Sequence, residues 1–130
     1  MKLKVKRIMK VKTKKLANSF KYAFEGFLTS FKTERNMKIH IFIMLLVILL
    51  GIILKINMNE WIICVILFST VIAAELFNTA IETVVDIVMP YKNPKAKIAK
   101  DVAASAVLIL AIGSIVVGGI IFLPKIINII

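Results

Sequence analysis

The sequence is short of the residues that cross-link small proteins or shape phosphate-binding loops. Its 130 residues include one cysteine, three prolines and five glycines. Because Cys64 is the only cysteine, no disulfide can form within the chain. No G-x-x-x-x-G-K-S/T motif occurs, so the glycines do not build the phosphate loop of a soluble kinase fold.

Acidic residues are also few. Seven Asp and Glu stand against 18 Lys and Arg, which gives a net charge of +11. Such a charge would usually suggest a nucleic-acid partner. However, 60% of the residues are hydrophobic, whereas soluble domains are about 45–50% apolar and disordered chains less so. We therefore expect a small, basic, integral membrane protein with no nucleic-acid partner.

Three apolar runs predict three membrane-spanning helices. They cover residues 39–54, 61–74 with a weaker continuation to 90, and 102–123. A spanning helix needs about 20 mostly apolar residues. We expect an all-α protein whose residues 34–130 form a transmembrane domain, with spans at about 36–55, 61–90 and 100–123. No signal peptide is expected, because the first apolar run begins only at Ile39.

The basic residues predict how these spans are oriented. Residues 1–38 hold twelve Lys and Arg, and residues 91–101 hold four more. Basic loops stay on the cytoplasmic side of a membrane. We expect a multi-pass protein of the cell membrane whose N-terminus and second loop are cytoplasmic.

The N-terminal region divides into a basic tail, residues 1–15, and a predicted surface helix, residues 16–33. The tail should be attracted to an anionic leaflet. In the predicted helix, which Asn18 could cap, four phenylalanines lie at helical spacing on one stripe: Phe20, Phe24, Phe27 and Phe31. This pattern is typical of an amphipathic helix that lies in the membrane interface. Packing of the stripe on the protein's own spans is the alternative.

The segment AAELFNTAIETVVD places polar side chains on one face of the second span. Glu75, Asn78, Glu82 and Asp86 fall within an arc of roughly 80° on a helix. If Trp61 marks the outer interface, Glu75 lies about 21 Å inward, roughly 9 Å below the cytoplasmic boundary of a hydrocarbon core about 30 Å thick. Glu82 then lies near that boundary.

Charges at this depth are costly, so the acidic face needs cations, water or polar partners. One plain alternative is interhelical hydrogen bonding by Asn78 and Thr79. A second, for Asp86 alone, is an ion pair with Lys92 or Lys95. Glu34, at the entrance of the first span, lies at the depth of Glu82, although it could instead pair with Arg35 or Lys38.

The chemistry of these groups favours phosphoryl transfer. Carboxylate and amide oxygens suit Mg²⁺, and Lys100, at the entrance of the third span, suits phosphate. Mg²⁺, cations and a carboxylate base are the groups that phosphoryl transfer uses.

The motifs EL-x-NTAIE-x-VVD, TERN and AKD-x-A-x-AVL resemble the prokaryotic diacylglycerol kinase family, over about residues 15 to 123. KYAFEGF and ERNMKIH are similar to its Gram-positive branch, whose members are more often undecaprenol kinases. The resemblance implies a homotrimer of three-span chains with a surface helix, with active sites between neighbouring subunits.

The resemblance also implies roles for single residues. Glu75 would be the general base for the lipid hydroxyl, and Glu34 and Glu82 would hold the Mg²⁺ that is bound to ATP. ATP would also contact further residues, which are Tyr22, Asn78, Lys100 and Asp101. Asp86 matches the motif in a supporting role.

We therefore expect an ATP-dependent lipid kinase that converts undecaprenol to undecaprenyl phosphate. A diacylglycerol kinase that makes phosphatidic acid is the alternative within the class. A small proton- or ion-coupled transport subunit using Glu75 and Glu82 as a relay is the alternative of another class, and a non-catalytic oligomer is a third.

Overall fold

The computed structural model describes residues 2–130 as four α-helices: α1 (Lys2–Thr33), α2 (Arg35–Ile53), α3 (Met58–Val88) and α4 (Pro94–Ile127). The chain divides into two units, one that ends at Thr33 and one from Glu34 to Ile130. The described residues contain no strand, which confirms the expected all-helical class.

The first unit, α1, is a single helix of 32 residues. The prediction that a helix begins at an Asn18 cap is wrong, because the basic segment and the phenylalanine segment share one continuous helix. Lys, Arg, Leu and Met all have high helix propensity, which accounts for the longer helix. Every side chain from Leu3 to Gly26 is exposed.

In the second unit, α2, α3 and α4 are each long and apolar enough to cross a membrane. Most of their large apolar side chains are exposed, as expected for helices whose solvent is lipid rather than water. α4 begins six residues before the predicted third span, because Asn93 caps the helix through the backbone N–H groups of Lys95 and Ala96 and Pro94 takes the first helical position.

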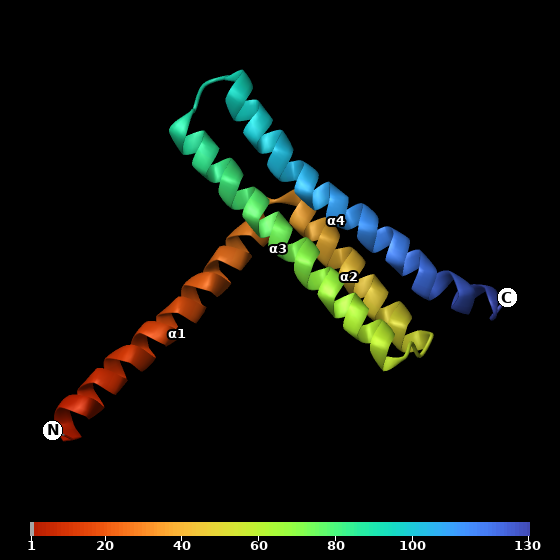
Figure 1. Cartoon of the computed structure of the whole chain (residues 1–130), viewed down its shortest axis with the longest axis horizontal. Coiled ribbons are helices and arrows are strands. Elements are labelled where there is room, and N and C mark those ends of the chain that lie inside the picture. The colour runs from red at the N-terminus through yellow and green to blue at the C-terminus, as the bar shows by residue number, and fades with distance from the viewer. Residues whose placement is uncertain (1) are drawn as a thin grey trace. The chain divides into compact units, whose positions relative to one another are not determined.

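A tight turn joins α2 to α3, and the two helices run antiparallel (Figure 1). Ile56 N–H donates to the carbonyl of Gly51, and Lys55 N–H donates to that of Ile52, which is the Schellman pattern of a helix end. Lys55 takes the left-handed conformation that this pattern requires, with φ of 51°. Asn57 and Glu60 then form a reciprocal capping box that starts α3.

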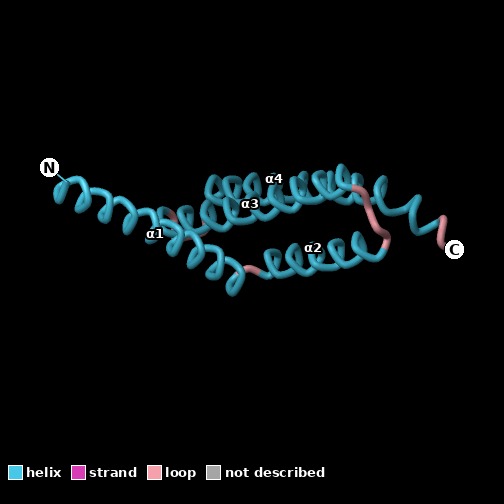
Figure 2. Tube along the Cα trace, turned by 90° about the horizontal axis from the view of Figure 1, so that it is seen from below, coloured by secondary structure: helices cyan, strands magenta, loops and turns pink. Residues whose placement is uncertain are grey.

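α3 and α4 form the longest contact of the unit and lie side by side in both views (Figures 1 and 2). An ion pair links α3 to α4 at each end of their contact. Asp86 pairs with Lys100 at one end, and Glu60 pairs with Lys125 at a distance of 3.2 Å at the other. Because α-helices rise uniformly, these two pairs fix the antiparallel register between them.

The apolar core lies toward the α2–α3 turn. Its buried members are Ile56, Cys64, Ile121 and Phe122. Trp61 packs against this cluster and also contacts Gly51, where an added Cβ would lie 2.8 Å from the Trp61 ring. Polar and charged side chains concentrate at the opposite end of the unit, which holds the candidate site.

Candidate functional site

The candidate site is built on the face of α3 that also carries its core residues. Cys64, Val71, Glu75 and Asn78 are the buried residues of α3, and their spacing places them along one side of the helix. Glu75 is only 1% exposed and Asn78 only 5%. The acidic face predicted from the sequence therefore continues the buried stripe of the helix instead of facing lipid.

The Glu75 carboxylate is buried, and neither of its oxygens has a hydrogen-bond partner in the part of the chain that the structure describes. The Thr79 hydroxyl donates to the backbone carbonyl of Glu75, at 3.0 Å, and not to the carboxylate. The α3–α4 register places Leu110 and Ala111 at the level of Glu75, and neither side chain has a hydrogen-bond donor. Such a buried acceptor is costly to leave unsatisfied, which marks it as a group awaiting a partner.

Asn78 and Glu82 extend the site toward the end of α3. The Asn78 side-chain amide donates to a Glu82 carboxylate oxygen at 3.3 Å, while the Asn78 carbonyl oxygen is buried without a partner. Glu34, which lies just before α2, and Glu82 are both within electrostatic reach of Glu75. The fold thus brings together three acids, two from α3 and one from the residue that precedes α2.

Basic residues border this acidic group on α4. Lys100 is ion-paired with Asp86 and is also within electrostatic reach of Glu82. The prediction that Asp86 pairs with Lys92 or Lys95 is therefore wrong. Because α4 already begins at Pro94, Lys100 lies almost two turns into the helix and on the side that packs against α3.

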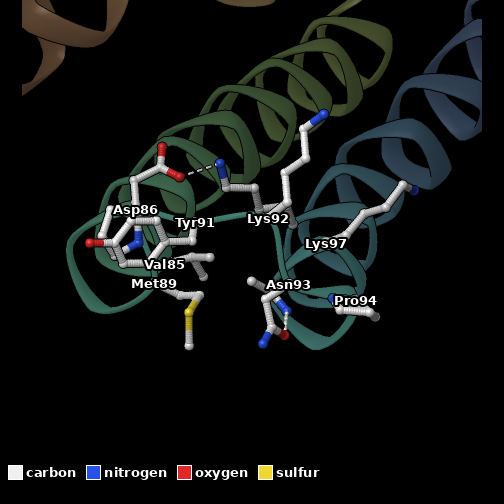
Figure 3. Close-up of a pocket in the computed structure, with 11 residues that line it drawn as sticks. Val85, Asp86, Met89, Tyr91, Lys92, Asn93, Pro94 and Lys97 are labelled. Atoms are coloured by element: carbon white, nitrogen blue, oxygen red, sulfur yellow. Dashed lines mark hydrogen bonds and ion pairs between the residues drawn. The ribbon is translucent and has the colours of Figure 1, made fainter.

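The α3–α4 connection surrounds a cavity of about 770 Å³ at this end of the unit. Asp86 and Tyr91 lie close to each other on one side of it, and Asn93 and Pro94 lie on the other (Figure 3). Its basic lining residues are Lys92, Lys97 and Lys100. A cavity with three cations and one acid is suited to a phosphate-bearing ligand.

Two of the predicted nucleotide-binding residues are exposed. Asp101 is exposed and pairs with Lys97, one turn earlier on α4. Tyr22 belongs to α1, the other unit, and its side chain is 63% exposed. His40 lines a second cavity of about 280 Å³, whose other lining residues are almost all apolar.

Two residues were not predicted from the sequence to be buried or ion-paired. Met37 is fully buried at 0% exposure, and its position three residues after Glu34 could have placed it on the same helical face. Lys97 pairs with Asp101, a pairing that the i,i+4 spacing could have indicated.

The oxygen ligands of the site fit a magnesium ion that is shared with a nucleotide. Within residues 2–130, no group of three or more His, Cys, Asp or Glu side chains is placed to hold a metal by itself. Mg²⁺ is usually held by one or two carboxylates, with substrate phosphates and water completing its octahedron. Glu34 and Glu82 would supply those carboxylates.

The chain matches the family described as prokaryotic diacylglycerol kinase over residues 21–122. Undecaprenol kinase of Bacillus subtilis is 39% identical over 107 residues, which cover 82% of this chain and 87% of that protein. Diacylglycerol kinase of Haemophilus influenzae is 36% identical over 108 residues, covering 82% and 92%.

A third relative, diacylglycerol kinase of Synechocystis sp., is 39% identical over 111 residues, covering 85% of this chain and 63% of that protein. The relatives are thus named for two different lipid substrates and share one type of reaction. Together with the three membrane-length helices, these matches show that the chain belongs to the prokaryotic diacylglycerol kinase family and is a membrane-embedded lipid kinase.

Proposed function

We propose that this kinase transfers the γ-phosphoryl group of ATP to undecaprenol, at the cytoplasmic interface of the cell membrane. The similarity to the Bacillus subtilis undecaprenol kinase, which extends over 87% of that protein, supports this substrate. Diacylglycerol is the second candidate, because the two other relatives described above are named for it.

The observation that carries the proposal is the partnerless carboxylate of Glu75. A buried acceptor that receives no hydrogen bond from the described residues 2–130 is suited to take a proton from a substrate hydroxyl. With Trp61 at the outer interface, Glu75 lies about 21 Å along α3 from that interface. A lipid hydroxyl lies just beneath the cytoplasmic headgroups, which is the same depth.

In the proposed reaction, the lipid oxygen attacks the γ-phosphorus as Glu75 accepts the hydroxyl proton. A new P–O bond forms to the lipid while the bond to the bridging β–γ oxygen breaks, and ADP leaves with the electron pair of that bond. Glu75 then releases its proton to solvent. Phosphoryl transfer depends mainly on such positioning and on charge stabilisation.

The other residues position the nucleotide. Glu34 and Glu82 would hold Mg²⁺, which neutralises phosphate charge when it is bound. Asn78, through its partnerless carbonyl oxygen and its amide, would orient the base and the phosphate.

At the cytoplasmic end, Lys100 would exchange its ion pair with Asp86 for phosphate contacts, which leaves Asp86 in a supporting role. Asp101 and Tyr22 would contact the nucleotide. The order along α3, with the base Glu75 deeper in the membrane and the metal ligand Glu82 nearer the cytosol, matches a lipid that comes from the membrane and ATP that comes from the cytosol.

The active protein is proposed to be a homotrimer with the N-terminus in the cytoplasm. The exposed apolar faces of the three membrane-length helices and the partnerless polar atoms of α3 are both consistent with neighbouring copies that complete the site. Native mass spectrometry of the protein released from detergent would measure the stoichiometry, and a monomer that is fully active would contradict the trimer.

A kinase assay on the purified protein, with undecaprenol and diacylglycerol at equal mole fractions in mixed micelles, tests the proposal. We expect a clear preference for undecaprenol, and a loss of about 10²–10⁴ in kcat for Glu75→Gln because the general base is removed. Glu25→Gln is the control, since Glu25 is an exposed residue of α1 paired with Lys21 at 3.9 Å.

The assay tests the lipid substrate and the role of Glu75 separately. Preference for diacylglycerol would replace the substrate and keep the mechanism. Substantial residual turnover of Glu75→Gln, in protein that is still folded, would remove Glu75 from the role of base.

A further inference from the structure

The basic half of α1 is a feature that the proposed reaction does not use. Residues 2–15 carry eight Lys and Arg and no acid, and the first acid of the chain is Glu25. The match to the kinase family begins only at residue 21, so this segment lies outside the part shared with the family.

Nothing in the described part of the chain neutralises these cations. The ion pairs of the structure involve other lysines, and no cation between Lys4 and Lys15 has a further interaction. The hydroxyl groups of the region are satisfied within the helix, since Thr13 donates to the carbonyl of Met9 at 2.8 Å and Ser19 donates to that of Lys15 at 3.0 Å.

As an isolated helix, this segment would repel itself. Lys2, Lys6, Lys10 and Lys14 follow one another at intervals of four residues, and like charges at that spacing destabilise a helix. Helices in proteins gain most of their stability from packing against other elements, yet every residue from Leu3 to Gly26 is exposed. The helix therefore needs a negatively charged surface outside the chain.

The side chains between the cations indicate what kind of surface this is. Leu3, Val5, Ile8, Met9 and Val11 are between 50% and 87% exposed. Around the helix they alternate with the cations and do not form a separate stripe. Long basic side chains can extend toward headgroups while apolar neighbours enter the acyl boundary.

We propose that residues 2–15 bind the anionic phospholipid headgroups of the bilayer in which the enzyme is embedded. The segment is joined to the membrane-spanning unit through one continuous helix and the single residue Glu34. The bilayer that holds this unit is therefore the anionic surface to which the segment is tethered. Each cation near such a surface adds attraction, and eight of them add up to stable contact.

Hydrogen exchange of the protein in lipid nanodiscs tests the proposal. It measures how strongly the backbone amides of the helix are protected, and it does not depend on catalysis. The backbone amides of residues 2–15 should exchange about tenfold more slowly in discs that contain phosphatidylglycerol than in phosphatidylcholine discs. The difference should shrink at high salt, since salt screens exposed charges.

Two matched variants assign the effect to charge. Replacing Lys4, Lys6, Lys10 and Lys12 together by Gln keeps the helix propensity and should abolish the extra protection. Replacing the same four residues by Arg keeps the charge and should preserve it. Equal protection of wild type and the Gln variant in both lipids would overturn the proposal.

Soluble anions test whether the segment prefers the lipid headgroups to other negatively charged partners. An RNA oligonucleotide or inorganic phosphate, added to phosphatidylcholine discs at matched ionic strength, should protect residues 2–15 less than phosphatidylglycerol does. Protection equal to or greater than that by the anionic lipid would overturn the assignment to the bilayer.

Discussion

Single side chains show how a membrane helix can carry charge at an acceptable cost. An acid within the hydrocarbon costs at least about 2.5–3.5 kcal/mol on insertion scales. Here Glu75 is withdrawn from lipid and buried at 1% exposure, while Glu60 is held by the backbone N–H of Asn57 and by Lys125. Of these two acids of α3, Glu60 is paired, whereas the Glu75 carboxylate has no hydrogen-bond donor among residues 2–130, a difference that supports the base role proposed for Glu75.

The metal-ligand roles proposed for Glu34 and Glu82 lead to a prediction about magnesium. If each supplies one carboxylate to Mg²⁺, Glu82→Gln or Glu34→Gln should raise the Mg²⁺ concentration for half-maximal activity by at least about tenfold. The measurement is a Mg²⁺ titration of lipid phosphorylation at saturating lipid. Glu25→Gln should titrate like the wild type. A variant that loses kcat with an unchanged Mg²⁺ requirement would show that its acid is not a metal ligand.

At the scale of elements, the α2–α3 turn is held by close packing as well as hydrogen bonds. Gly51 provides the carbonyl that receives the Ile56 N–H, and its missing side chain leaves room for Trp61 and Ile56. A Cβ at this position would lie 2.8 Å from the Trp61 ring and 3.1 Å from the Ile56 side chain. The turn therefore has almost no free volume.

Gly51→Ala should destabilise the protein by about 1–2 kcal/mol, because overpacking exceeds the gain in helix propensity. Gly113→Ala is the matched control on α4, where an added Cβ meets nothing within 4 Å. Denaturant unfolding in detergent would measure both. Adding Trp61→Phe should restore part of the loss, and equal stabilities of the two alanine variants would contradict the packing argument.

For the whole molecule, the distribution of basic residues predicts the orientation in the membrane. Lys92, Lys95, Lys97 and Lys100 lie at the α3–α4 connection, and only Lys55 lies at the α2–α3 turn. Both α1 and the α3–α4 connection should be cytoplasmic. The candidate site would then face the cytosol, where ATP is present.

Cysteine labelling tests this orientation, because Cys64 is the only native thiol. In a Cys64→Ser background, a membrane-impermeant maleimide should label Asn59→Cys in intact cells. It should label Lys92→Cys only after the cells are permeabilised. Both positions are exposed, so the opposite pattern would reverse the orientation and move the site to the outer face.

The sequence by itself determined the number and type of the spanning helices and the polar face of α3. Both follow from local composition and helical period, which need no information about neighbouring segments. The motifs were also sufficient to identify the family, and the matches to known proteins confirmed it. The sequence did not reveal that α1 begins at Lys2, since the high helix propensity of lysine leaves no boundary signal in a basic segment.

Only the tertiary structure decided which of these polar groups have partners. The partner of Asp86 depends on where α4 begins and on the register of the α3–α4 hairpin. These place Lys100 beside Asp86, although Lys92 and Lys95 are closer to Asp86 in the sequence. The same register places the apolar Leu110 and Ala111 at the level of Glu75, and no described residue donates a hydrogen bond to its buried carboxylate. Contacts between helices depend on register and on helix ends, and these are set by packing along the whole length of the elements.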